Sequence, residues 1–450
     1  MRVLAPGALA LLVLWAMMAP ARPAPAPAWG AAAVLLVFLG TFGALALDLV
    51  GRLTAVALGA AGCLTLGAAL GFYFPSQAAA YLWGKGDTLL LLAGIGLVTG
   101  LLQEGGFFER LARRVVAAAG GDPRRVVLSL CALTYGLSLL MNNLATILVI
   151  VPLSLRVAEA LDLDPVDLVL GEIIASNLGG ASTMIGDFPN MLIATETGLP
   201  FHDFLVYLAP VCLLELGLLL AVLGVRTPRR PVAAQRLRRL TAGLASSRWD
   251  PVAVSRGQAI LAAMVAGFAL GGWLGVGPGA IAAAGAGAAL LAAGRHRSAL
   301  VRHAGGDDVL FFACLFLMVG AVDASGALDG VARSWAGLWQ GGRVAGGLAL
   351  VWGAAGLTCF LNAGPTTALL VHLVLTSAAP ADPAVWWALS LGVCAGSSAT
   401  LTGATAGPVS ASLLERRGVC LTFNRFARTG VPVMVGFLLL SSAYVVWLLR

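Results

Sequence analysis

Apolar stretches of about 20 residues recur along the whole 450-residue chain. A stretch of this length is what an α-helix needs to cross the hydrocarbon core of a bilayer, which is about 30 Å thick. Only 11% of the residues are charged, whereas a soluble domain carries about 25%. Backbone groups in lipid must be bonded within helices or closed barrels, and the apolar runs are continuous rather than alternating. We therefore predict an all-α polytopic membrane protein.

The candidate spans fall into two groups separated by a polar, arginine-rich segment. The spans are 30–48, 54–73, 87–103, 126–160, 166–197 and 203–225, followed by 257–275, 277–294, 308–324, 344–376, 384–414 and 430–449. We predict a first repeat over 30–225, a basic cytoplasmic linker over 226–256 and a second repeat over 257–450. Residues 1–29 fit either a signal peptide or an extra N-terminal helix.

The formal net charge of +7 comes almost entirely from arginine, since Lys85 is the sole lysine. The arginines lie in short loops between apolar spans, as they do in cytoplasmic loops of membrane proteins. This distribution indicates a bilayer partner and argues against nucleic-acid binding. The seven cysteines are scattered singly, without the spacing of a zinc site.

The chain before the linker is related in sequence to the chain after it. Residues 87–113 align with residues 307–333 at a displacement of 220 positions, with Asp, Ala, Gly and Arg matches in the same order. The same displacement places Asn142 on Asn362 and Thr146 on Thr366. Chance similarity between apolar segments explains such matches poorly, so we predict two structural repeats.

Charge indicates how these repeats are oriented. The loop after span 87–103 carries five arginines, and its counterpart after span 308–324 carries two. Conversely, the loop before residue 308 is basic, and the loop before residue 87 holds only Lys85. Because Lys and Arg are enriched in cytoplasmic loops, equivalent loops should face opposite sides. Such inverted-topology repeats are typical of secondary transporters, which bind their substrate at the repeat interface.

Each repeat contains an apolar region too long for one crossing and interrupted by polar residues near its centre. These residues are Asn142, Asn143 and Thr146 in span 126–160, and Asn362, Thr366 and Thr367 in span 344–376. Two half-helices that meet at a tip fit such a region better than one helix does. Asparagine oxygens can bind a cation, and free N–H groups at the start of a half-helix can bind an anion.

A second interruption, rich in Gly, Ser and Thr, follows in each repeat. Its candidate ligands are Ser176, Asn177, Thr183, Asp187 and Asn190 in the first copy, and Ser397, Ser398, Thr400 and Thr405 in the second. The second copy has Ala404 where the first has Asp187. Gly and Pro free carbonyl groups that can coordinate Na⁺, and Asp187 adds a charge. Packing of small residues is the alternative for either segment alone, but the recurrence of both kinds of segment favours a binding site.

The stretch from Ser176 to Asn190, with Glu172 just ahead, closely resembles the signature of the ion transporter superfamily, which includes the citrate transporter-like permeases. It is most similar to the branch of arsenite permeases, P-protein-like permeases and sodium/proton antiporters. The resemblance covers about residues 30–449 and is specific to the superfamily, not to a substrate. It implies re-entrant hairpins at the asparagine segments, broken helices after them, and ion and substrate sites between a scaffold and a moving domain. It also implies a homodimer.

The chain departs from this branch at its tips. Members often carry an Asp-Asn pair there, but here the tips read Asn142-Asn143 and Asn362-Ala363, and Phe188 stands where a proline is usual. A proton exchanger needs a titratable group in its site. Asp187 and Glu172 are therefore the candidate proton carriers, and Asn142, Asn143 and Asp187 the candidate Na⁺ ligands. These departures weaken the case for sodium/proton antiport and leave it open.

The sequence thus predicts a secondary active transporter that works by alternating access. Na⁺ or H⁺ would be coupled to, or exchanged for, a small inorganic or carboxylate anion. We expect it in the inner (plasma) membrane, without enzymatic activity and with no cofactor beyond the coupling ion. A degenerate channel or non-transporting membrane subunit is the alternative that the missing tip carboxylates favour. His372 is a weaker site candidate. Glu104, Asp323 and Glu215 lie near span ends and are predicted to be solvated or to snorkel to the membrane surface.

Overall fold

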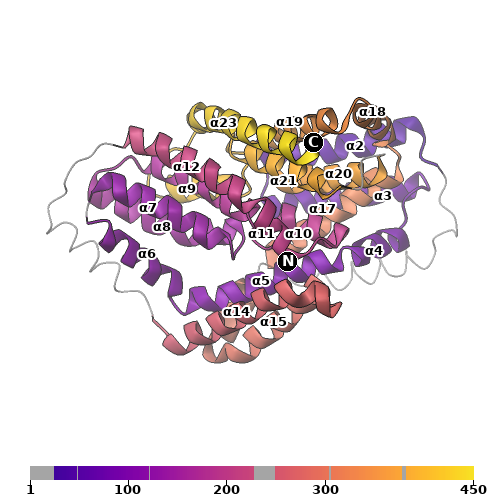
Figure 1. Ribbon diagram of the computed structural model, residues 1–450. Coiled ribbons are helices and arrows are strands. Elements are labelled where there is room, and N and C mark those ends of the chain that lie inside the picture. The colour runs from indigo at the N-terminus through magenta and orange to yellow at the C-terminus, as the bar shows by residue number, and fades with distance from the viewer. Residues whose placement is uncertain (1–24, 48, 121, 228–248, 304–305, 378–381) are drawn as a thin grey trace.

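The computed structural model describes residues 25–47, 49–120, 122–227, 249–303, 306–377 and 382–450, and in these ranges the chain forms helices and turns without a strand (Figure 1). Eight of the described helices are long and apolar enough to cross a membrane, and a bent pair makes a ninth. The predicted all-α polytopic membrane protein is confirmed. Most of the segment 1–29 and most of the linker 226–256 lie outside the described residues.

The helices before the linker begin in an apolar pair and end in a long span. They are α2 (Ala28–Ala46), α3 (Arg52–Ala69), α4 (Pro75–Gly84), α5 (Gly86–Glu104), α6 (Phe107–Ala118), α7 (Pro123–Ser138), α8 (Asn143–Leu161), α9 (Pro165–Ala181), α10 (Phe188–Thr197), α11 (Phe201–Tyr207) and α12 (Ala209–Arg226).

The helices after the linker follow a similar order. They are α14 (Pro251–Leu274), α15 (Pro278–Ala292), the 3₁₀ turn η2 (Gly294–His296), α16 (Arg297–His303), α17 (Gly306–Ala324), α18 (Asp329–Gln340), α19 (Arg343–Leu361), α20 (Ala363–Thr376), α21 (Pro383–Ser397), α22 (Gly407–Glu415) and α23 (Phe423–Leu449). Helix α14 begins before the predicted start at residue 257. The reason is that Asp250 caps it by accepting from two backbone N–H groups, with Pro251 at the first helical position.

The long apolar regions are divided where the sequence predicts. Span 126–160 folds as α7 and α8 around a short turn, and span 344–376 as α19 and α20, which meet at Asn362. The next two regions are broken helices, with α9 and α10 separated at 182–187, and α21 and α22 separated at 398–406. Asn142, Asp187 and Asn362 cap the half-helices α8, α10 and α20, because their side chains accept from backbone N–H groups at the helix starts.

The first helices of each group pack against a long helix of the other group. Helix α3 lies against α17, and α15 lies against α5. The second contact is close because a Cβ atom on Gly94 of α5 would lie 2.4 Å from the carbonyl oxygen of Ala282 in α15. The two groups are therefore interlocked rather than placed side by side.

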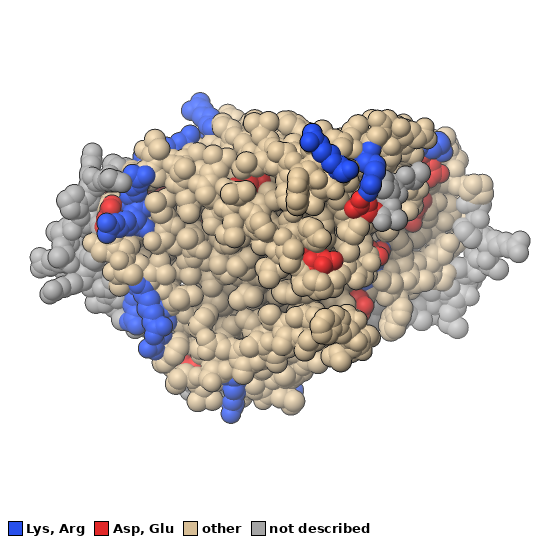
Figure 2. Space-filling view, in the orientation of Figure 1, with Lys and Arg blue, Asp and Glu red and all other residues tan. Residues whose placement is uncertain are grey.

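Arginine gathers at one end of the helix bundle, which we term the basic end. Its members among the described residues include Arg110, Arg113 and Arg114 of α6, Arg124 and Arg125 of α7, and Arg226, Arg417 and Arg425 at the ends of α12, α22 and α23. Figure 2 shows blue Lys and Arg atoms along the left of the view and again at the upper right, and the area between the left edge and the red atoms right of centre is mostly uncharged. A lipid-facing belt requires such a surface.

Contacts between helix ends give the direction of each helix. At the basic end, Arg425 pairs with Asp164 and Arg417 lies 3.9 Å from Glu159, so the starts of α9 and α23 lie with the ends of α8 and α22. At the opposite end, His372 lies 2.9 Å from Asp323, which joins the ends of α17 and α20. Helix α5 leads toward the arginines of α6, whereas α17 leads away from the basic end. These two corresponding helices run in opposite directions.

Candidate functional site

Asn143, the first residue of α8, connects three segments near the middle of the bundle. Its Nδ2 donates to Oδ2 of Asp187 at 2.8 Å and to Oδ1 of Asn177 at 3.3 Å. Its Oδ1 accepts from the hydroxyl of Ser138 at 2.6 Å. The side chain is 1% exposed. The tip of the α7–α8 pair, helix α9 and the break before α10 therefore meet at one amide group.

Two asparagines join this cluster to the second group of helices. Asn177 donates to the backbone oxygen of Ser397 at 3.0 Å and to the hydroxyl of Ser398 at 3.4 Å. Asn190 accepts from the hydroxyl of Ser390 in α21 at 2.6 Å. The predicted residues of the first copy thus lie at the contact between the two helix groups.

Thr183 and Thr400 hold the two breaks in the same way. Thr183 donates to the carbonyl oxygen of Leu139 at 2.7 Å and accepts from Gly186 N at 3.1 Å. Thr400 donates to the carbonyl oxygen of Cys359 at 2.8 Å and accepts from Gly403 N at 2.9 Å. Each threonine ties the turn after a broken helix to the preceding tip, so both are structural parts of the site.

Asp187 is a partly buried carboxylate without a cationic partner among the described residues. It caps α10, with Oδ1 accepting from Phe188 N at 2.9 Å, so the positive end of the helix dipole faces it. A carboxylate in a membrane interior is costly unless it meets a cation or a proton.

A small cavity of about 10 Å³ lies beside Asp187. Its polar lining comes from Asn177, Asp187, Asn190, Ser390, Cys394 and Ser397. Such a volume has room for about one water molecule or a small ion. The arrangement can therefore hold one dehydrated cation or one water against the carboxylate.

Asn362 forms the second tip in a backbone conformation that non-glycine residues rarely adopt. Its φ is +75° and its ψ is 157°, and such strain costs about 1–3 kcal/mol. Its Nδ2 donates to the carbonyl oxygen of Thr402 at 3.1 Å, and its Oδ1 accepts from the hydroxyl of Thr405 at 3.3 Å. These bonds hold the tip against the break before α22.

A cavity of about 280 Å³ opens beside this second tip. Asn362, Thr402, Thr405, Ser412 and Arg52 supply its polar lining. Arg52 pairs with Asp308 at 2.8 Å and lies 4.1 Å above the ring of Phe311. The cavity therefore combines hydroxyl and amide groups with one guanidinium group.

Several predicted ligands use their side chains within their own helices. Asn142 caps α8 by accepting from Ala145 N at 2.7 Å, and Thr146 donates to the carbonyl oxygen of Asn142 at 3.1 Å. Thr367 likewise donates to Ala363 O at 2.7 Å. Ser397 and Ser398 both donate to the carbonyl oxygen of Cys394. Thr366 is fully buried, and its hydroxyl has no partner in the described part of the chain.

Ser176 and Glu172 lie behind the site on α9. The hydroxyl of Ser176 lies 3.3 Å from that of Ser138, and Glu172 accepts from the hydroxyl of Ser154 on α8. Glu172 is fully buried, and its second carboxylate oxygen has no partner among the described residues.

The prediction that Glu215 is solvated is wrong. The side chain is 1% exposed and accepts from the hydroxyl of Ser441 in α23 at 2.8 Å. Its place near a span end was misleading because α23 covers that face of α12. Ser138, Ser390 and Ser441 were also missed, since a single serine in an apolar helix carries no recognisable pattern.

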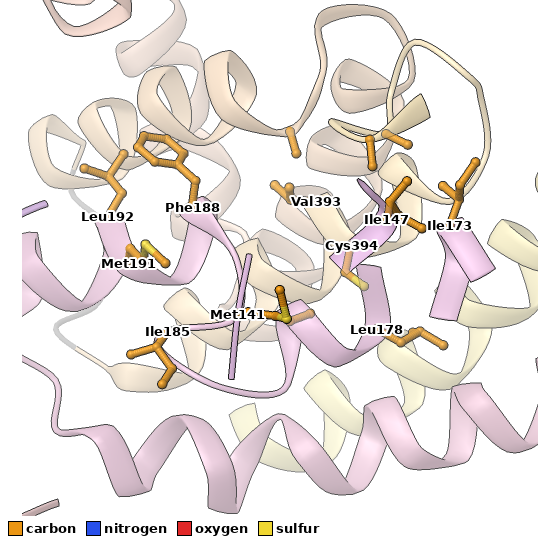
Figure 3. Close-up of a cluster of buried hydrophobic side chains, with 14 of the residues drawn as sticks. Met141, Ile147, Ile173, Leu178, Ile185, Phe188, Met191, Leu192, Val393 and Cys394 are labelled. Atoms are coloured by element: carbon orange, nitrogen blue, oxygen red, sulfur yellow. The ribbon is translucent and has the colours of Figure 1, made fainter. Parts of the chain in front are cut away.

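Apolar side chains also pack around the break, and some of them line the small cavity together with the polar groups. Figure 3 shows Met141 at the tip, Ile185 in the break, Phe188, Met191 and Leu192 of α10, and Val393 and Cys394 of α21. Phe188 stacks on Phe312 of α17 with ring centroids 3.6 Å apart. The residue that replaces the usual proline therefore packs against the other helix group and helps to exclude water.

In this helical membrane bundle each tip meets the break of a broken helix at polar side chains, an arrangement typical of membrane transporters. The chain belongs to the citrate transporter family, whose model matches residues 4–392. The predicted resemblance to citrate transporter-like permeases is confirmed.

Relatives of this chain include a magnetosome protein, proteins named as uncharacterized transporters and the P protein. It is 36% identical to the magnetosome protein MamN of Magnetospirillum gryphiswaldense, over 91% of this chain and 98% of that protein. It is 31% identical to an uncharacterized transporter of Mycobacterium tuberculosis, over 80% of this chain and 86% of that one. The P protein of Sus scrofa is 26% identical over 92% of this chain and 58% of that protein.

A solved structure has a similar fold. The YdaH transporter of Alcanivorax borkumensis superposes with a TM-score of 0.56 at 14% identity, over 83% of this chain and 87% of that one. At this identity the likeness concerns the fold alone.

Proposed function

We propose that the protein is a secondary active transporter of a small ion and that Asp187, Asn143 and Asn177 form its coupling-ion site. The observation that carries the proposal is the carboxylate of Asp187. It lies inside a membrane bundle without a cationic partner among the described residues and is held at 2.8 Å by the amide of Asn143. Such a group binds a cation or a proton, and its place between the two helix groups suits release after they move.

The two helix groups support alternating access as the mechanism. Corresponding helices such as α5 and α17 run in opposite directions, and Thr183 and Thr400 make corresponding hydrogen bonds. We infer an inverted-topology repeat from these relations. Transporters built in this way expose a midplane site to each side in turn.

The cavity beside Asn362 supports a small inorganic or carboxylate anion as the transported or exchanged partner. Hydroxyl and amide donors and Arg52 line it, and such donors suit oxyanions. Its lining includes the C-terminal end of α2 and the start of α3 beside α22, which leads to the basic end. The positive-inside rule makes that end cytoplasmic, so we infer that this state faces the cytoplasm.

The membrane and the oligomeric state are also proposals. We propose the inner (plasma) membrane for a chain of this class and a homodimer by analogy with the superfamily. The name of the relative from Magnetospirillum gryphiswaldense makes a magnetosome membrane the alternative location. Separation of the two membranes after cell lysis, followed by immunodetection, tests this point.

A non-coupled channel or non-transporting subunit is the second candidate. It is favoured by the second helix group, where Ala363 and Ala404 stand in place of Asn143 and Asp187. The second helix group therefore lacks the counterpart of the Asn143–Asp187 ion site. Saturable ion exchange by the purified protein would argue against a channel or a non-transporting subunit.

Counterflow in vesicles tests the proposal. Purified protein is reconstituted with labelled Na⁺, arsenite, sulfate or citrate under imposed sodium and pH gradients. We expect saturable exchange of at least one ion, and Asp187→Asn should lower it by about 100-fold or more, as loss of a buried charged ligand costs several kcal/mol. Glu159→Gln, which changes a carboxylate that is 78% exposed, is the control. No exchange by the wild type, or full exchange by Asp187→Asn, would contradict the proposal.

A further inference from the structure

The cavity of about 280 Å³ beside the second tip has a single charged residue among its described lining residues, Arg52. Arg52 is the first residue of α3, and its guanidinium carbon lies 4.1 Å from the centre of the Phe311 ring in α17. A ring in this position stabilises the positive charge by a cation–π contact. The contact uses none of the guanidinium N–H donors, which are the groups that bind carboxylates. The cavity therefore offers one fixed positive charge.

Most of the other polar side chains of this cavity are hydrogen-bonded to protein groups. The hydroxyl of Thr405 donates to Oδ1 of Asn362 at 3.3 Å, and the hydroxyl of Thr402 donates to the carbonyl oxygen of Cys359 at 3.3 Å. A hydroxyl group has one proton to donate, so both threonines have used theirs. Arg52 is therefore the strongest donor that the described lining presents to an anion.

Arg52 is paired with one carboxylate through one hydrogen bond. Its Nη1 donates to Oδ1 of Asp308 in α17 at 2.8 Å, and this is the bond that joins the two side chains in the described part of the chain. Their side chains are 33% and 15% exposed. A partly exposed ion pair with a single hydrogen bond contributes little stability. The pair is therefore weak enough for a carboxylate in the cavity to take the place of Asp308.

Apolar side chains form most of the remaining wall of this cavity. Phe42 and Leu45 come from α2, Phe360 from α19 and Val409 from α22. An anion with two or three charges would place its further charges against these side chains, and burying a charge without a partner is costly. An anion with one charge and an apolar body avoids this cost and gains from burial of its CH₂ groups. The lining therefore favours a monovalent organic anion.

We propose that this cavity binds a monocarboxylate with a compact apolar body, and that its carboxylate replaces that of Asp308 on Arg52. The inference rests on the function proposed above and narrows the anion of that function to this class. The cavity volume of about 280 Å³ is near the lower limit of about 300 Å³ for small-molecule pockets, so a body of a few carbon atoms fits. Asp308 neutralises Arg52 until the anion arrives.

Isothermal titration of the purified full-length protein in non-ionic detergent tests the anion class without transport. The ligands are acetate, butanoate, hexanoate, sulfate and citrate at neutral pH. We expect the affinity to rise from acetate to hexanoate by about two- to fourfold for each added CH₂ group. Sulfate and citrate should bind at least about tenfold more weakly than hexanoate. Equal affinity along the carboxylate series, or tighter binding of sulfate or citrate than of hexanoate, would overturn the proposal.

Variants of the ion pair test the exchange of one carboxylate for another. We expect Arg52→Gln to weaken hexanoate binding at least about tenfold, Arg52→Lys to weaken it less, and Asp308→Asn to tighten it by about two- to fivefold, since the competing carboxylate is gone. The matched control is Arg343→Gln, because Arg343 pairs with Asp382 and lies outside the cavity lining. Unchanged binding in both Arg52 variants, or weaker binding in Asp308→Asn, would refute the proposal. If Arg52→Gln does not fold, Arg52→Lys and the carboxylate series decide.

Counterflow of labelled hexanesulfonate separates this inference from the function on which it rests. A sulfonate carries the same single charge as a carboxylate but has no neutral form at neutral pH, so it crosses the lipid slowly by itself. We expect saturable exchange by the wild type, inhibition by hexanoate, and at least about tenfold slower exchange by Arg52→Gln. Exchange of citrate or sulfate without exchange of hexanesulfonate would overturn the inference and leave the proposed function standing. Binding of hexanoate without exchange of any tested ion would contradict the proposed function itself.

Discussion

At the scale of single residues, Asn143 determines where the charge of Asp187 lies. It donates to Asp187 and Asn177 and accepts from Ser138. Because these partners come from three segments, the orientation of the amide group is set by all of them together. Without this side chain, the N–H of Phe188 is the remaining described donor to Asp187.

Replacing Asn143 by alanine should weaken ion exchange through Asp187. We expect Asn143→Ala to lower counterflow about 10- to 100-fold, because a hydrogen bond to a charged group is worth about 1.5–3 kcal/mol. In the Asp187→Asn background the same change should have little further effect. A double-mutant cycle of counterflow rates measures this coupling, and equal losses in both backgrounds would show that the two residues act independently.

At the scale of elements, the tips and breaks depend on close contact between helices. A Cβ atom on Gly179 of α9 would lie 2.3 Å from the carbonyl oxygen of Tyr135 in α7. A Cβ atom on Gly396 of α21 would lie 2.3 Å from the carbonyl oxygen of Ala355 in α19. Glycine thus allows each broken helix to approach the helix that leads to the tip, which brings Asn143 and Asn362 to the breaks.

Alanine at these glycines should destabilise the protein in detergent. We expect Gly179→Ala and Gly396→Ala to lower the free energy of unfolding by about 1–3 kcal/mol, because the helices must move apart. The control is Gly136→Ala on α7, where an added Cβ atom meets nothing within 4 Å. That change should be neutral or stabilise by up to about 1 kcal/mol. Thermal unfolding followed by tryptophan fluorescence compares the three variants, and equal shifts would contradict the packing argument.

At the scale of the whole molecule, contacts at the end opposite the basic end join α5 to α10. Lys85, just before α5, lies 2.7 Å from Glu196, and the hydroxyls of Thr88 and Thr195 lie 2.5 Å apart. The larger polar cavity instead lies beside α22, which leads to the basic end. Alternating access would require the contacts between α5 and α10 to separate when the site opens to the other side.

A covalent link at this position should stop transport. In a cysteine-free background, Lys85→Cys with Glu196→Cys should form a disulfide that lowers counterflow by about tenfold or more, and a reductant should restore it. The matched control is Arg343→Cys with Asp382→Cys, since this ion pair joins the starts of α19 and α21, which pack together in one helix group. Transport that continues through the linked Lys85–Glu196 pair would show that these contacts do not open.

Much of the fold was predictable because a membrane span requires a continuous apolar stretch, and both the stretch and its polar interruptions can be recognised from neighbouring residues. The polar tips at Asn142–Asn143 and Asn362 and the break at Asp187 are visible as interruptions of apolar runs. The burial of Glu215 was not predictable, because it depends on α23, which follows more than 200 residues later in the sequence. The same holds for the partners of Asn177 and Asn190 on α21.

The sequence by itself determined the class of protein, the division of long spans into half-helices and the identity of the polar interruptions. These follow from hydropathy, length and local backbone requirements, which act over neighbouring residues. Only the tertiary structure decided which polar side chains meet. Asn143 reaches Asp187 and Asn142 does not, because Asn142 caps α8. That choice depends on how helices distant in sequence pack, and a side chain one position along a helix points to a different neighbour.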